Sequence, residues 1–223
     1  MQPLRRAEGL TLIEVMVVVA IVAVTAALAV PSWLQFQSDQ RVRTATRTVA
    51  NALQFARAQA IATGNNHAVY FGMGPGTDAC GTPLLDSTGN IVPILVLDDG
   101  PAGAGSNCCI DGGDTVATIV RGQAGVLWGA TRATAPPAAD SGGGTFATGA
   151  TFTDPNGTQA RWVLFRPDGI PVAFTPACNR GEVGSGGGGV YLTNGNRDYA
   201  VVLSPLGTVK VHRYEAGSGG WID

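Results

Sequence analysis

Charged residues, aromatic residues and histidine are scarce in this chain of 223 residues. Asp, Glu, Lys and Arg make up 13% of it, aromatic residues make up 7%, and there are two histidines. The formal net charge is −2, so no strongly basic surface is expected and nucleic acid is not the default partner. Glycine, by contrast, occurs 32 times, which is about twice its usual share of about 7% and favours a domain rich in loops and strands.

The motifs of common enzyme and cofactor sites are also missing. His67 and His212 are the only candidates for a general base at neutral pH, and the sequence has no nucleophile elbow and no metal-binding pair of histidines. A glycine run, Gly184 and residues 186–189, lacks the Gly-Lys-Ser/Thr ending of a phosphate loop and is predicted to be a flexible loop. We therefore expect no enzymatic activity and no cofactor; an anchored enzyme would depend on one of the two histidines.

The four cysteines, an even number, favour disulfide bonds in a domain outside the cytoplasm. They are Cys80, Cys108, Cys109 and Cys178. A bond between the adjacent Cys108 and Cys109 would close a strained small ring, so we expect one of them to pair with Cys80 and the other with Cys178. Four thiolates could instead bind zinc, but no C-x-x-C spacing is present.

Six acidic residues follow one another between positions 78 and 114 without any Lys or Arg. They are Asp78, Asp86, Asp98, Asp99, Asp111 and Asp114. Oxygen-rich loops can bind calcium, but the ordered ligand spacing of a dedicated calcium loop is absent. A solvated acidic face without a metal is the interpretation that we favour.

A long apolar run over residues 10–30 dominates the N-terminal part of the sequence. Only three of its residues are polar: Thr11, Glu14 and Thr25. As a helix, the run spans roughly 32 Å at about 1.5 Å per residue, enough to cross a bilayer core. Arg5 and Arg6 precede it, which predicts a cytoplasmic leader and a domain outside. A carboxylate at membrane depth is costly, so Glu14 is expected to have a function.

Residues 32–64 are predicted to continue this helix as an amphipathic stretch. Apolar or small residues recur at the i, i+3, i+4, i+7 spacing of one buried helix face: Val42, Ala45, Val49, Ala52, Leu53, Ala56 and Ala60. Pro31 lies between the two halves and is expected to kink the helix, because proline removes a backbone donor and crowds the preceding turn. Gly64 is expected to end it.

Short runs rich in β-branched and aromatic residues predict strands in the remaining chain. They are expected at residues 67–71, 91–97, 116–121, 126–131, 159–165, 190–193, 199–203 and 208–214, and residues 133–150 are expected to form a loop. The prediction is therefore an α+β fold: a transmembrane helix over 10–31, an amphipathic helix over 32–64 and a β-rich head over 65–223.

The N-terminal segment resembles the processing signal of type IV pilins and of type II secretion pseudopilins. A leader over residues 1–9 precedes Gly9-Leu10-Thr11-Leu12-Ile13-Glu14 and the apolar helix, and Pro31 stands where pilin helices carry a proline. The resemblance implies cleavage by prepilin peptidase between Gly9 and Leu10, with N-methylation of Leu10. It also implies that Glu14 meets the N-terminal amine of a neighbouring subunit during assembly, which offsets the burial of both charges. An ordinary single-pass anchor is the alternative.

Later segments resemble the GspH/FimT branch of these proteins, which includes FimU-like minor pilins. They are residues 52–61, residues 165–169 and the terminal hairpin around Gly207. The resemblance implies a head of two packed antiparallel sheets on the long helix. It implies a low-copy structural subunit of a type IV pilus, with other pilins as partners, first in the inner membrane with the head in the periplasm and then in the filament or its tip. A pseudopilin of a type II secretion system is the alternative.

Some members of this branch bind DNA through an arginine-rich C-terminal hairpin. Here the corresponding region offers a modest basic patch: Arg197, Lys210, His212 and Arg213. Its Gly207-Thr208-Val209-Lys210 lacks the first arginine of the Gly-Arg-x-Arg pattern. DNA capture is therefore a further alternative, and its mark would be an affinity that falls steeply with salt.

Overall fold

The structure is a computed structural model that describes residues 11–223 except 87, 102–105, 112–113 and 121. The chain divides into two compact units, Met1–Ser38 and Asp39–Asp223. Helix α1, Leu12–Thr63, contributes residues to both, and the strands all belong to the second unit, the head.

Helix α1 is a single element where the sequence predicts two consecutive stretches. Pro31 lies inside it, so the helix continues although the carbonyl four residues earlier loses its usual N–H partner. Gly64 ends the helix as predicted: its φ is 73° and its N–H donates to the Ala60 carbonyl at 3.1 Å. This left-handed conformation is the usual reason for a glycine just beyond a helix.

Two antiparallel sheets make up the head, which confirms the predicted α+β fold of one long helix on two sheets. The first has the order β3-β2-β1-β5-β6, comprising β1 (Asn65–Phe71), β2 (Ile94–Pro101), β3 (Thr115–Val120), β5 (Trp162–Phe165) and β6 (Pro171–Val172). The second has the order β10-β9-β8-β7-β4, comprising β4 (Leu127–Trp128), β7 (Gly188–Thr193), β8 (Asp198–Leu203), β9 (Val209–Glu215) and β10 (Gly220–Ile222).

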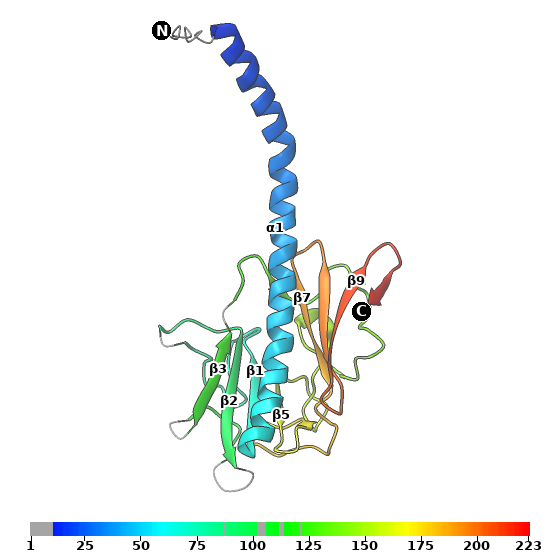
Figure 1. The fold of residues 1–223 in the computed structure, drawn as a ribbon. Coiled ribbons are helices and arrows are strands. Elements are labelled where there is room, and N and C mark those ends of the chain that lie inside the picture. The colour runs from blue at the N-terminus through cyan, green and yellow to red at the C-terminus, as the bar shows by residue number, and fades with distance from the viewer. Residues whose placement is uncertain (1–10, 87, 102–105, 112–113, 121) are drawn as a thin grey trace, which may run out of the picture. The chain divides into compact units, whose positions relative to one another are not determined.

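One face of α1 within the head packs against both sheets (Figure 1). The buried helix residues are Val42, Thr46, Val49, Ala50, Ala52, Leu53, Ala56 and Ala60. They share a single core with side chains from β1, β2, β5, β7 and β8. Thr46 is the polar member that the apolar spacing does not predict, and its hydroxyl donates to the Val42 carbonyl at 2.7 Å. This internal hydrogen bond removes the cost of burying the hydroxyl.

Strand β1 is buried on both of its faces, which explains why its second half, residues 68–71, has no alternation of polar and apolar residues. Val69 and Phe71 face the helix core, whereas Ala68 and Tyr70 belong to a second cluster on the other side of the first sheet. Loops carrying Leu84 and Cys108 cover that second cluster.

The segment predicted as the loop 133–150 is pinned to the outer face of the second sheet. The Trp221 indole Nε1 donates to the Ala135 carbonyl at 2.8 Å. The Asp140 carboxylate accepts hydrogen bonds from the Thr151 hydroxyl, at 2.7 Å, and from the Tyr191 hydroxyl. Within this stretch only the short 3₁₀ helix η1, Phe146–Thr148, is regular, so side-chain hydrogen bonds order the segment.

Several strand bounds differ from the sequence prediction because neighbouring loops take part of the pairing. Residues 91–93 precede β2 instead of joining it, and Ile91 bridges Leu85. Residues 159–161 likewise precede β5, since Gln159 bridges Thr153. The predicted strand at 126–131 is reduced to the two residues of β4, and β6 and β10 are not predicted at all.

The glycine run is not a flexible loop at its second half, so that prediction is wrong there. Gly188 and Gly189 lie in β7, and both are buried. A Cβ on Gly188 would lie 2.6 Å from the Phe152 ring, and one on Gly186 would lie 2.5 Å from backbone atoms of Pro171 and Val172. The absence of side chains therefore permits close packing.

The packing of the helix core can be tested through the stability of the head. Leu53 is 0% exposed, so Leu53→Ala should lower the free energy of unfolding by about 2–5 kcal/mol through lost burial and a residual cavity. Gln54→Ala, on the exposed side of the same turn, should change it by less than about 0.5 kcal/mol. Urea unfolding of the detergent-solubilised chain measures both; equal effects would contradict this packing.

Candidate functional site

The start of α1 forms a helix cap that also contains Glu14. The Glu14 N–H donates to the Thr11 hydroxyl oxygen at 3.3 Å, and the helix begins at Leu12. A Thr followed three residues later by Glu is the capping-box pattern, in which the Glu side chain can reach back to the first backbone N–H. The Thr-Leu-Ile-Glu motif thus caps the helix. From the sequence, this motif is assigned to processing and assembly, and the cap is not predicted.

The rest of the first unit presents an apolar surface. From Leu12 to Phe36 every large hydrophobic side chain is exposed, including Trp33 at 62%. The Thr25 hydroxyl donates to the Ile21 and Val22 carbonyls at 3.0 Å, so its polar group is satisfied inside the helix. Among the described residues, α1 is the one helix long and apolar enough to span a membrane.

The predicted cleavage position precedes the described residues in the sequence. Gly9 and Leu10 lie outside the residues that the structure describes, so cleavage between them and methylation of Leu10 remain predictions. Pro31, the predicted kink, lies within the exposed half of α1.

An ion pair fixes the beginning of the helix segment that belongs to the head. The Arg197 Nε lies 2.6 Å from the Asp39 Oδ2, and the Asn194 amide donates to the other oxygen of Asp39 at 2.9 Å. Both partners come from the turn between β7 and β8, so this turn is fastened to the first helical residue of the head.

The carboxylate of the neighbouring Asp198 binds the backbone of residues 131–133. It accepts hydrogen bonds from the N–H groups of Thr131, Arg132 and Ala133 at 2.6–3.1 Å. Burial alone would raise the pKa of Asp198, but the hydrogen bonds from Thr193 and from these backbone groups together hold this pKa below its usual value. The ionised carboxylate therefore stabilises this end of the head.

The four residues predicted as a DNA-binding patch are not brought together as one surface. Arg197 pairs with Asp39. His212 is buried, and its Nδ1 lies 2.7 Å from the Asp223 carboxylate. Lys210 is exposed beside Val202, whereas Arg213 is half-buried beside Tyr199. Alternation along β9 places Lys210 and Arg213 on opposite faces of the sheet.

Arg213 instead joins two helix arginines, which sequence analysis did not single out as a site. Arg43, Arg47 and Arg213 line a pocket together with Tyr199. The Arg43 Nε donates to the Tyr199 hydroxyl at 3.1 Å, and this hydrogen bond raises the pKa of Arg43. The i, i+4 spacing of Arg43 and Arg47 is the signal that could have placed them on one helix face.

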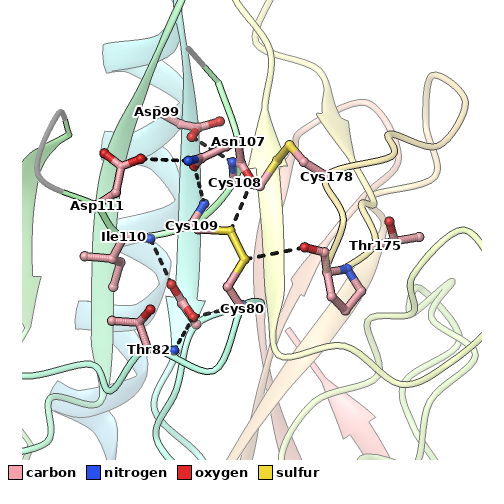
Figure 2. Close-up of a disulfide and its surroundings, with 12 residues drawn as sticks. Cys80, Thr82, Asp99, Asn107, Cys108, Cys109, Ile110, Asp111, Thr175 and Cys178 are labelled. Carbon is pink, nitrogen blue, oxygen red and sulfur yellow. Dashed lines mark hydrogen bonds between the residues drawn. A yellow bond between two sulfur atoms is a disulfide. The ribbon is translucent and has the colours of Figure 1, made fainter.

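Two disulfides connect three loops on the outer side of the first sheet (Figure 2). Cys80 is bonded to Cys109 and Cys108 to Cys178, which selects one of the two arrangements left open by the sequence. Cys108 and Cys178 have φ values of 59° and 58°, a left-handed conformation that costs a non-glycine residue about 1–3 kcal/mol. No cysteine of the described chain is free, so no thiolate remains for zinc.

The acidic segment is only partly a solvated face, because two of its members are buried. Asp78 accepts hydrogen bonds from the N–H groups of Cys80, Thr82 and Ile110 at 2.7–2.9 Å. Asp99 accepts from the Cys108 N–H at 2.9 Å and from the Ser106 hydroxyl, and burial raises the pKa of Asp99 despite these bonds. Both carboxylates thus support the disulfide-linked loops, and Figure 2 shows Asp99 beside Cys108.

The two histidines occupy structural positions. His67 lies in β1 and is 1% exposed, with its Nε2 at 3.9 Å from the Asp98 carboxylate. His212 is 6% exposed. Neither lines any of the described pockets, so the described geometry offers no support for a histidine-based active site.

Comparison with known proteins gives one finding, at the N-terminus. Residues 4–30 match the family model described as the prokaryotic N-terminal methylation motif. No curated protein and no solved structure matches the chain. The motif supports a type IV pilin-like or pseudopilin-like protein, and it implies processing by prepilin peptidase and assembly with other pilins. It covers the exposed apolar half of α1 and agrees with membrane anchoring through this segment.

The Asp198 cluster predicts a pH-dependent contribution to stability. Because the pKa of Asp198 is lowered in the folded state, its stabilisation should be present above about pH 4 and lost as the pH falls below its folded pKa. At pH 7, Asp198→Asn should therefore lower the free energy of unfolding by about 1–3 kcal/mol.

The measurement is urea unfolding of both proteins between pH 7 and pH 3. The difference between them should shrink toward the acid end. Glu182→Gln, at an exposed position, is the matched loss of one carboxylate and should show no such trend. A difference for Asp198→Asn that is independent of pH would contradict the role of its charge.

Proposed function

We propose that the chain is a minor pilin of the GspH/FimT branch, a structural subunit that is cleaved after Gly9 and assembled into a type IV pilus or its tip complex. The observation that carries the proposal is the match of residues 4–30 to the methylation motif on a helix half whose large apolar side chains are all exposed. The two-sheet head on the second half of the helix supports the choice of branch. Its role is assembly, without catalysis.

The physical basis of assembly is the exchange of lipid for the helices of other subunits. The large apolar side chains of residues 12–36 are exposed, so they require an apolar environment. Cleavage after Gly9 would create an amine at Leu10, four residues before Glu14 in the sequence. An amine of one subunit paired with Glu14 of the next would set the register of neighbouring helices, because neither charge is tolerated alone in that environment.

A pseudopilin of a type II secretion system is the second candidate, because the same N-terminal motif serves both filaments. Deleting the gene separates the two: loss of surface pili supports the minor pilin, and loss of protein secretion with normal pili supports the pseudopilin. DNA capture has less support than either, since the four predicted contact residues lie in separate environments.

The first test is the identity of the mature N-terminus. In cells with active prepilin peptidase, the intact mass of the membrane-extracted protein should correspond to loss of residues 1–9 and addition of one methyl group at Leu10. Cells without the peptidase provide the control and should yield the full-length mass. Recovery of residues 1–9 on the protein from peptidase-positive cells would refute the proposal.

The second test separates the charge of Glu14 from its role in the helix cap. Gln can still cap the helix but cannot pair with an amine, so Glu14→Gln should be cleaved normally and yet enter filaments at least about tenfold less. Removing one partner of a buried ion pair costs about 3–5 kcal/mol, which exceeds the roughly 1.4 kcal/mol of a tenfold change.

Thr11→Ala is the matched control, since it removes the cap and keeps the charge. The cap contributes about 1 kcal/mol, so this variant should enter filaments at a level much closer to that of the unchanged protein. Immunoblots of sheared filaments against membranes measure the ratio. Equal losses for the two variants would assign Glu14 to helix capping alone.

A further inference from the structure

Three arginine side chains and one acidic residue, Asp223, line a pocket of the head. The pocket has a volume of about 370 Å³ and lies between α1 and strands β8 and β9. Its lining residues are Arg43, Thr46, Arg47, Tyr199, Val211, Arg213 and Asp223. The helix supplies two of the guanidinium groups and β9 the third.

The described ion pairs do not involve the three arginines, although the charge of Asp39 also acts on Arg43. Among the described residues, no carboxylate forms an ion pair with Arg43, Arg47 or Arg213. Arg43 uses its Nε for the Tyr199 hydroxyl, which leaves the two terminal nitrogens of its guanidinium. The one acidic lining residue, Asp223, already lies 2.7 Å from the His212 Nδ1. Asp39, the nearest helix carboxylate in sequence, is held by Arg197.

We propose that this pocket binds the phosphate of an anionic phospholipid head group. Guanidinium groups present their N–H donors in a planar fork that matches the oxygens of a phosphate, and several forks around one hollow can bind different oxygens of the same group. The Tyr199 hydroxyl holds Arg43 in place for this contact. The pocket volume of about 370 Å³ is large enough for a phosphoglycerol head group.

The position of the arginines in the sequence favours a lipid as the source of this phosphate. No charged side chain occurs between Glu14 and Asp39, and Arg43 follows the last residue of the exposed apolar stretch, Phe36, by seven positions. Helical side chains lean toward the N-terminal end of their helix, which for Arg43 and Arg47 is the direction of the apolar stretch. Basic residues next to a membrane-spanning segment are attracted to anionic lipids.

This inference rests on the membrane-anchored stage of the proposed function. A lipid bound at Arg43, Arg47 and Arg213 would hold the head against the membrane before assembly, and it would have to be released when the subunit enters a filament. The pocket is thus assigned to the state that precedes assembly, whereas Glu14 belongs to the assembled state.

The test uses the full chain, purified in a neutral detergent and titrated calorimetrically with a water-soluble, short-chain phosphatidylglycerol. The probes for comparison are short-chain phosphatidylcholine, inorganic phosphate and a short DNA duplex. Phosphatidylglycerol should bind at least about tenfold more tightly than phosphatidylcholine, a difference that corresponds to one charge-assisted hydrogen bond. It should also bind more tightly than free phosphate and DNA.

Two variants identify the pocket without removing a described contact. Arg47→Gln and Arg213→Gln should each weaken phosphatidylglycerol binding by about tenfold, since each removes one charged donor. Arg166→Gln makes the same change of charge in the turn after β5, where Arg166 pairs with Asp168 at 3.0 Å, and it should leave the affinity unchanged. Circular dichroism confirms that each variant is folded.

Four results would overturn the inference. They are equal binding of the two lipids, inorganic phosphate binding as tightly as phosphatidylglycerol, tighter binding of DNA, and an affinity unaffected by Arg47→Gln and Arg213→Gln. The titration requires neither cleavage nor a filament, so failure here leaves the cleavage and Glu14 tests unaffected, and failure of those tests leaves the lipid affinity measurable.

Discussion

The packing of α1 against two sheets at once is the contact on which the head depends. Four of the eight buried helix residues are alanines, and their small side chains let the backbones of helix and sheets approach closely. Side chains of five strands meet at this helix face in one core. Neither sheet alone could bury both the helix face and its own apolar residues. The second half of α1 is therefore part of the core of the head.

Aspartate side chains accept hydrogen bonds from loop N–H groups that no helix or strand pairs. A chain with 32 glycines has many loop N–H groups that no strand or helix pairs. Asp78, Asp140 and Asp198 each accept several hydrogen bonds from loop or neighbouring residues. Because these carboxylates satisfy buried donors, the three aspartates contribute to the folding of the head.

Elements with a regular sequence pattern could be predicted from the sequence. Contacts between residues that lie far apart in the sequence could not. The stripe containing Leu53 follows from the helical spacing, and the hairpin of β8 and β9 follows from its turn around Gly207. Gly188 was misread as flexible because the adjacent Phe152 ring lies 36 residues away in the sequence. Likewise, strand alternation separates Arg213 from Lys210, but it does not show that Arg43 and Arg47 lie beside Arg213.

The two disulfides also change how the head would respond to tension along the chain. Their sequence separations are 29 and 70, and they meet at the adjacent Cys108 and Cys109. A pull on the two ends therefore passes from Cys80 to Cys109, Cys108 and Cys178 through covalent bridges and bypasses almost all of the intervening chain. At about 3.3–3.6 Å per residue, this shortens the maximum extension of an unravelled head by roughly 300 Å. With its core pulled apart, the head would therefore extend to only about half the length that the same chain would reach without disulfides.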